Sequence, residues 1–144
     1  MTPRPTATVR ATHRYEASCE RVFDAWLDPK VAGRFLFATP TGQMIRAEID
    51  PRVGGRFTFT DRRPEMGEVE HTGTYIAIER PRRLVFDFCV PAYDPTPTRV
   101  TLDFAPAGDG CELTLTHEGV LEAYVKQTES GWGMILTGLE RALG

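Results

Sequence analysis

The sequence predicts an α+β domain in which a curved antiparallel sheet of about six or seven strands packs against one long C-terminal helix. Two observations predict this class. Successive segments between residues 44 and 118 alternate apolar and polar residues, the period of half-buried strands. The segment from about 123 to 143 repeats its apolar residues at helical spacing instead. Short turns separate the strands, so neighbouring strands are expected to run antiparallel.

The N-terminal part of the chain predicts one strand and then two short helices. Residues 1–6 carry two prolines and are expected to be flexible, and residues 7–16 alternate weakly, as a first strand would. Ser18 precedes a helical face made of Val22, Phe23, Trp26 and Leu27. Asp28-Pro29 then predicts a second helix, because aspartate caps free backbone N–H groups and proline fits the first helical position.

The remaining strands are expected near residues 44–49, 55–61, 68–79, 83–90, 98–105 and 111–118. The turn at 107–110 is the clearest, since its Asp-Gly pair lies between two alternating runs, as in a β-hairpin. The last strand is expected to end at Gly119. The directions of Tyr75 and Ile76 stay open, because a β-bulge between Thr72 and Ile76 would exchange them.

The final helix combines an apolar stripe with three glycines. Each of Gly131, Gly133 and Gly138 costs about 1 kcal/mol relative to alanine inside a helix. Close packing against the sheet or the first strand is the favoured explanation, and room for a ligand is the alternative. The stripe consists of Leu121, Val125, Thr128, Trp132, Ile135, Leu136, Leu139 and Leu143.

Size and composition predict a single domain over residues 1–144 and exclude several functional classes. The net charge of −3 lacks the basic character of nucleic-acid-binding domains, and no apolar run approaches the ~20 residues of a membrane helix. Cys19, Cys89 and Cys111 form no CxxC pair, so neither a disulfide framework nor a zinc site is expected. We expect a reduced cytoplasmic location, with no metal and no cofactor.

Four stretches together resemble a known family: residues 50–59, 71–88, 100–119 and 129–143. They contain G-x-Y-x-x-I-x-x-P-x-R-L-V-F, a GDG hairpin, L-T-L-x-H-E-G and a terminal helix with G-W. This combination resembles the helix-grip proteins of the START/Bet v 1-like (SRPBCC, polyketide cyclase/dehydrase-related) superfamily, and in particular its AHSA1-like branch, named for the activator of the Hsp90 ATPase. The resemblance implies an apolar cavity between the curved sheet and the last helix.

The sequence departs from this family near the expected mouth of the cavity. Family members often carry a tryptophan pair in the second helix, where this chain has Arg34-Phe35-Leu36-Phe37. The segment between His117-Glu118-Gly119 and the last helix is also short. Both departures bear on how wide and how open the cavity is.

The side chains expected to face the last helix are rich in aromatic rings, which predicts an apolar ligand site. The alternative is that the rings interlock at ordinary core density. The candidate ligand-binding residues are Phe35, Phe57, Phe59, Tyr75, Phe86, Phe88, Leu102, Phe104, Leu115, His117, Trp132 and Leu136.

His117 is the candidate catalytic residue, because it shares the inward direction of Leu115 at a strand end. A neutral imidazole there could act as a general base near pH 7, whereas the favoured alternative is a histidine satisfied by hydrogen bonds within the protein. Glu118 is expected to point to the opposite face of the strand and is therefore a poor acid–base partner for His117. Asp61 and Tyr75 are the remaining candidates for a second acid or base.

Three functions follow, in order of preference. The first is a protein that binds a small hydrophobic or aromatic ligand. The second is a polyketide cyclase/aromatase-like enzyme that uses His117. The third is an Hsp90-type co-chaperone or stress-response interaction domain, which the resemblance alone suggests. Nucleic acid and membrane insertion are not expected, and a homodimer formed through an edge strand is compatible with the sequence.

Overall fold

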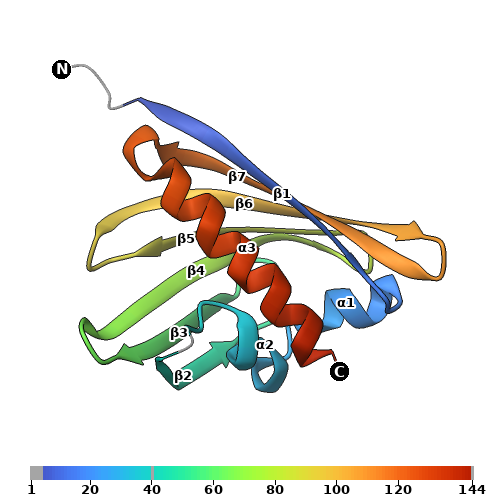
Figure 1. Ribbon diagram of the computed structural model, residues 1–144, viewed down its shortest axis with the longest axis horizontal. Coiled ribbons are helices and arrows are strands. Elements are labelled where there is room, and N and C mark those ends of the chain that lie inside the picture. The colour runs from blue at the N-terminus through green and yellow to red at the C-terminus, as the bar shows by residue number, and fades with distance from the viewer. Residues whose placement is uncertain (1–4, 40, 144) are drawn as a thin grey trace.

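The computed structural model describes residues 5–39 and 41–143 and has the predicted α+β helix-grip architecture. Seven antiparallel strands form one sheet in the order β1-β7-β6-β5-β4-β3-β2, and the long helix α3 crosses one face of it (Figure 1). The elements in chain order are β1 (Thr6–Tyr15), α1 (Cys19–Ala25), α2 (Pro29–Phe35), β2 (Gln43–Ile49), β3 (Arg56–Arg63), β4 (Gly67–Glu79), β5 (Arg83–Val90), β6 (Asp94–Ala107), β7 (Gly110–Leu121), a 3-10 turn (Glu122–Tyr124) and α3 (Val125–Ala142).

The two short helices begin at the capping residues that the sequence predicts. The Ser18 hydroxyl accepts a hydrogen bond from the Arg21 backbone N–H at 3.2 Å. The Asp28 carboxylate accepts one from Lys30 at 3.0 Å, and Pro29 occupies the first position of α2. Because β1 and β2 are the two edges of the sheet, α1 and α2 carry the chain from one edge to the other.

β7 runs past Gly119, so the prediction that the strand ends there is wrong. Val9 pairs with His117 and Ala7 pairs with Val120, so Glu118 and Gly119 together oppose one residue of β1. Gly119 has a φ of +84°, a left-handed conformation that suits a β-bulge. The glycine therefore marks a bulge inside the strand, directly after His117.

Two further differences from the expected strands are small. β6 begins at Asp94, four residues before the expected start at 98. In the β6–β7 hairpin, Ala107 pairs with Gly110, and Gly108 adopts a φ of +62°, so the turn residues are Gly108 and Asp109. The hairpin lies where the sequence predicts it, but its turn is one residue earlier than the Asp109-Gly110 pair.

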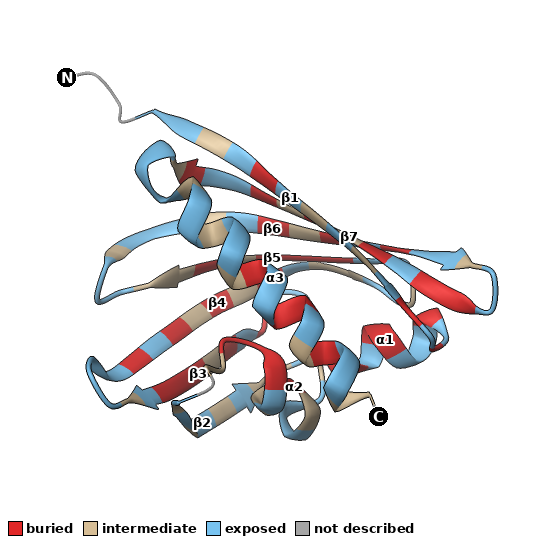
Figure 2. Ribbon diagram, viewed as in Figure 1, coloured by how far each residue is buried: buried red, intermediate tan, exposed pale blue. Residues whose placement is uncertain are grey.

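The core lies between the inner face of the sheet and the helices (Figure 2). α3 contributes Trp132, Ile135, Leu136 and Leu139 to it. A bulge between Tyr75 and Ala77 leaves Tyr75 buried and Ile76 exposed, which resolves the direction that the sequence left open. Phe57 contacts Phe86 edge to face with ring centroids 5.4 Å apart, so rings interlock beneath the middle of the sheet.

The three glycines of α3 have different surroundings. A Cβ at Gly138 would lie 3.3 Å from Phe35 Cβ, so this glycine allows close contact with α2 rather than with the sheet. At Gly131 and Gly133 an added Cβ would meet no atom within 4 Å. Gly133 is exposed, whereas Gly131 is partly buried.

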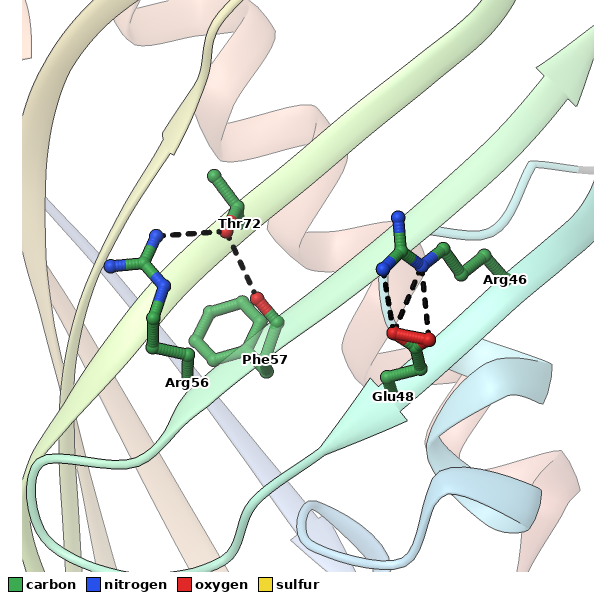
Figure 3. Close-up of polar contacts among 5 residues, drawn as sticks. All are labelled: Arg46, Glu48, Arg56, Phe57 and Thr72. Atoms are coloured by element: carbon green, nitrogen blue, oxygen red, sulfur yellow. Dashed lines mark hydrogen bonds and ion pairs between the residues drawn. The ribbon is translucent and has the colours of Figure 1, made fainter.

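The outer face of the sheet is largely polar, and no helix among the described residues covers it (Figure 1). Arg46 pairs with Glu48 at 2.7 Å, and Arg56 donates to the Thr72 hydroxyl at 3.2 Å (Figure 3). The Thr72 hydroxyl in turn donates to the backbone carbonyl of Phe57 at 3.1 Å. An apolar ligand site therefore has to be sought on the helix side of the sheet.

The three cysteines are free thiols. Cys19 on α1 and Cys111 on β7 are buried with their Sγ atoms 2.9 Å apart, and Cys89 is partly exposed. Among the described residues, no helix has the length and apolar character needed to cross a membrane.

Candidate functional site

A pocket of about 410 Å³ opens where the first half of α3 lies over the end of the sheet. Its walls come from the loop after α2, the end of β3, the start of β4, the end of β5 with the turn that follows it, the end of β7, and α3. Its aromatic wall includes Phe37, Phe88 and Trp132. Its polar lining includes Thr39, Arg63, His71, His117, Gln127 and Thr128.

A second hollow of about 1020 Å³ adjoins the first and shares Phe88, Val90, Tyr93, His117, Gln127 and Thr128 with it. Large apolar side chains are exposed around the two openings. Met134 lines the first, Met66 and Tyr124 line the second, and Tyr93 lines both. The entrance is therefore surrounded by apolar groups in contact with solvent.

Phe37 is the central ring of the pocket wall. It follows α2 in a left-handed conformation, with a φ of 59°, which is uncommon for a bulky residue and turns the chain sharply at this point. Its ring stacks on His71, with centroids 4.3 Å apart and planes 12° apart. It also contacts Phe88 at 5.2 Å and Trp132 at 6.0 Å. The loop after α2 thus supplies the wall that joins sheet and helix.

His117 is held by two hydrogen bonds, one on each ring nitrogen. The Trp132 indole N–H donates to Nδ1 at 3.0 Å, and Nε2 lies 2.7 Å from the Thr98 hydroxyl. Because an indole N–H can only donate, Nδ1 must be the acceptor and the proton of the neutral ring belongs on Nε2. His117 then donates to Thr98, whose hydroxyl points to the Phe88 carbonyl at 3.5 Å.

This arrangement leaves the neutral ring of His117 no free lone pair. Burial lowers the pKa of His117 to about 4, so the ring is neutral at pH 7. A general base needs an accessible lone pair, and the lone pair of His117 is occupied by Trp132. The geometry corresponds to the histidine satisfied within the protein, and its partners are α3 and β6.

His71 lines the same pocket in a different way. It is 7% exposed, and its Nδ1 has no hydrogen-bond partner. Burial, with the nearby Arg63 guanidinium as the second cause, lowers the pKa of His71 to about 4. Sequence reasoning did not select this residue, although its direction could be read from the alternation of His71, Gly73 and Tyr75 along β4.

Asp61 and Arg63 form the polar end of the inner face of β3. Asp61 is 1% exposed, and its Oδ2 accepts from the Thr39 hydroxyl at 2.9 Å and from Arg63 Nε at 3.1 Å. A Cβ at Gly42 would lie 2.4 Å from that carboxylate, so this glycine leaves space for it. The Asp61 carboxylate therefore holds the Nε end of the Arg63 guanidinium beside the pocket.

Of the candidate ligand-binding residues, Phe88, His117 and Trp132 are brought together on the pocket wall. Phe35 instead packs on Trp26, with ring centroids 5.2 Å apart, and under Gly138. The others are buried in the core and line neither hollow: Phe57, Phe59, Tyr75, Phe86, Leu102, Phe104, Leu115 and Leu136. Within the described ranges, no group of three or more His, Cys, Asp or Glu side chains is placed to hold a metal ion.

The fold is shared with several solved bacterial proteins. Protein CV1439 from Chromobacterium violaceum is 25% identical, with a TM-score of 0.85 over 94% of this chain and 96% of that one. The AHSA1-like protein from Aeromonas hydrophila is 24% identical, with a TM-score of 0.82 over 95% and 92%. The protein of unknown function SA2116 from Staphylococcus aureus is 13% identical, with a TM-score of 0.86 over 97% and 94%.

No curated protein matches the chain. One family model does, and it is described as activator of Hsp90 ATPase homolog 1-like protein. It matches residues 16–144, which comprise all of the chain after β1. The chain therefore belongs to the activator of Hsp90 ATPase homolog 1-like family.

Proposed function

We propose that this protein binds a small hydrophobic or aromatic molecule in the pocket between the end of the sheet and α3. The observation that carries the proposal is the pocket itself, about 410 Å³ in volume and walled by Phe37, Phe88 and Trp132. Concave sites with an apolar lining and a few polar groups are the usual form of small-molecule sites.

The exposed apolar rim supports the same proposal. Tyr93 is 61% exposed and Met66 is 53% exposed, and the Tyr93 hydroxyl reaches the Met66 sulfur at 3.5 Å. Exposed apolar side chains gathered at one place often mark an interaction site, because they cost solvation free energy when nothing covers them. A ligand that enters beneath this rim would cover part of it.

The enzyme hypothesis has weaker support, because His117 already uses both ring nitrogens within the protein. The co-chaperone hypothesis rests on the family description and on no side-chain feature of the chain. Ligand binding is therefore the function that we put forward for test.

The test uses the neutral dye Nile red, whose fluorescence rises in apolar surroundings. We expect saturable binding to the wild-type protein and at least about tenfold weaker binding to Gly131→Leu, because the new side chain extends into open space on the pocket wall. Gly133→Leu is the matched control. It makes the same change two residues away on the exposed face of α3.

Both substitutions replace a helical glycine with a better helix former, so both variants are expected to fold. Loss of dye binding in Gly131→Leu alone supports the pocket. Equal binding by Gly131→Leu, Gly133→Leu and wild type would overturn the proposal.

A further inference from the structure

The polar groups of the pocket divide into two sets. His117 is satisfied by Trp132 and Thr98 and has no free donor or acceptor in its neutral form. Arg63 keeps unused hydrogen-bonding capacity. It donates through Nε to Asp61, and its Nη groups make no hydrogen bond within the described residues. His71 Nδ1 also has no partner, but this atom is buried.

Arg63 and His71 come from neighbouring strands and face the same way. Phe59 pairs with His71 and Arg63 pairs with Gly67, so the two side chains face the same side of the sheet and are separated along it by the Asp61–Val69 pair. The Arg63 charge still acts on His71, whose pKa it helps to lower. Both residues line the pocket.

Arg63 is the only charged side chain among the described residues that line the pocket. Its counter-charge, Asp61, opposes anion binding but is 1% exposed and lies behind the wall, where it contacts Thr39 and Arg63. The Arg63 side chain is 21% exposed. A molecule in the pocket would thus meet the guanidinium before it met the carboxylate.

We infer that the ligand of this pocket is an anion: a hydrophobic molecule with a carboxylate, which the free Nη groups of Arg63 bind. The planar guanidinium matches a carboxylate in geometry, and hydrogen bonds between charged partners are about twice as strong as neutral ones. This inference rests on the proposed function and specifies its ligand.

The test compares two probes with one ring system, 2-naphthoate and 2-naphthamide, which differ in charge. Binding is followed by NMR through the Trp132 indole N–H, which lies at the pocket wall. We expect the wild-type protein to bind naphthoate at least about tenfold more tightly than naphthamide. Arg63→Met is expected to remove this preference, because it replaces the aliphatic part of the side chain with an unbranched one and loses the charge.

Arg62→Met is the matched control. Arg62 is the neighbouring residue on β3, is exposed, and lies 3.6 Å from Glu68 on the outer face. This variant should keep the wild-type preference for naphthoate. Arg63→Met leaves Asp61 buried without its cation, so the double variant Asp61→Asn, Arg63→Met, which removes both charges together, is measured as well.

The outcomes separate the inference from the proposed function. Loss of the preference in both Arg63 variants and its retention in Arg62→Met support the inference. Equal binding of both probes by the wild type, blocked by Gly131→Leu, would overturn the inference and leave the proposed function standing. Binding of neither probe, together with no binding of Nile red, would overturn both.

Discussion

Trp132 on α3 donates its indole N–H to Nδ1 of His117 on β7, across a distance of 3.0 Å. This hydrogen bond links the long helix to the strand beside the bulge, and it fixes the tautomer of the histidine. It also leaves Thr98 as the acceptor of the remaining ring proton. The contact has consequences that solution measurements can check.

We predict that His117 carries its proton on Nε2 and that Trp132→Phe costs more stability than Trp26→Phe. Trp26 is also buried, but its Nε1 has no hydrogen-bond partner, so its replacement loses ring area and no hydrogen bond. The difference in unfolding free energy is expected to be about 1 kcal/mol or more. Nitrogen NMR shifts report the tautomer, and urea unfolding reports the stabilities. Equal costs would contradict the prediction.

The two buried histidines predict a loss of stability at acid pH. The pKa of His117 and that of His71 are lowered to about 4 in the folded protein. In the unfolded chain both return to about 6.5, so below that pH the unfolded state binds protons that the native state does not. The unfolding free energy therefore falls as pH drops from about 6.5 towards 4, by about 2 kcal/mol per histidine between pH 7 and 5.

Urea unfolding at pH 7 and pH 5 measures this fall. His71→Phe should show a smaller fall than the wild type, because it removes one of the two groups and keeps a ring to stack on Phe37. An unchanged pH dependence in this variant would show that His71 does not contribute as described.

The glycines of α3 predict opposite responses to alanine. Gly133→Ala should stabilise the protein by about 1 kcal/mol, because the added methyl group meets open space and the helix gains propensity. Gly138→Ala should gain less or lose stability, because its Cβ would lie 3.3 Å from Phe35 Cβ. Thermal unfolding of the two variants compares them directly. The same rise in melting temperature for both would contradict the close contact.

The thiols predict an order of reactivity. Cys89 is partly exposed, whereas Cys19 and Cys111 are buried, and burial together with Cys19 raises the pKa of Cys111. We expect a thiol reagent to modify Cys89 first in the folded protein, because reagents reach exposed groups and react with thiolates. Cys89→Ser should remove the fast phase, while unfolding in urea should expose the remaining two. A fast phase that persists in Cys89→Ser would contradict the burial of the pair.

The fold could be predicted from the sequence, because helix starts and strand alternation are both determined by short stretches of residues. Ser18 and Asp28-Pro29 mark helix starts by their own chemistry, and the structure has helices that begin there. Strand alternation identifies Phe88 on the inner face of the sheet, and helical spacing identifies Trp132 on α3. Gly119 shows the limit of this reasoning, because a glycine at a strand end and a glycine in a bulge look alike until the partner strand is known.

The candidate site was harder to predict, because the position of its central ring depends on where α2 ends. Phe35 and Phe37 are two residues apart, and sequence reasoning selected the first. α2 ends at Phe35, and the left-handed turn at Phe37 then directs that ring to the pocket. Sequence reasoning did not select His71, although alternation along β4 places it on the inner face. Its missing hydrogen bond is visible only in three dimensions.

The order of strands in the sheet has a consequence for synthesis. β1 pairs with β7, so among the described residues the first strand of this sheet along the chain has the last strand as its partner. Contacts between such distant parts of a chain form slowly, because the entropy of closing a long loop is lost before the contacts stabilise the fold. The β2-to-β7 meander can assemble as it emerges from the ribosome, while β1 stays unpaired until β7 has been synthesised.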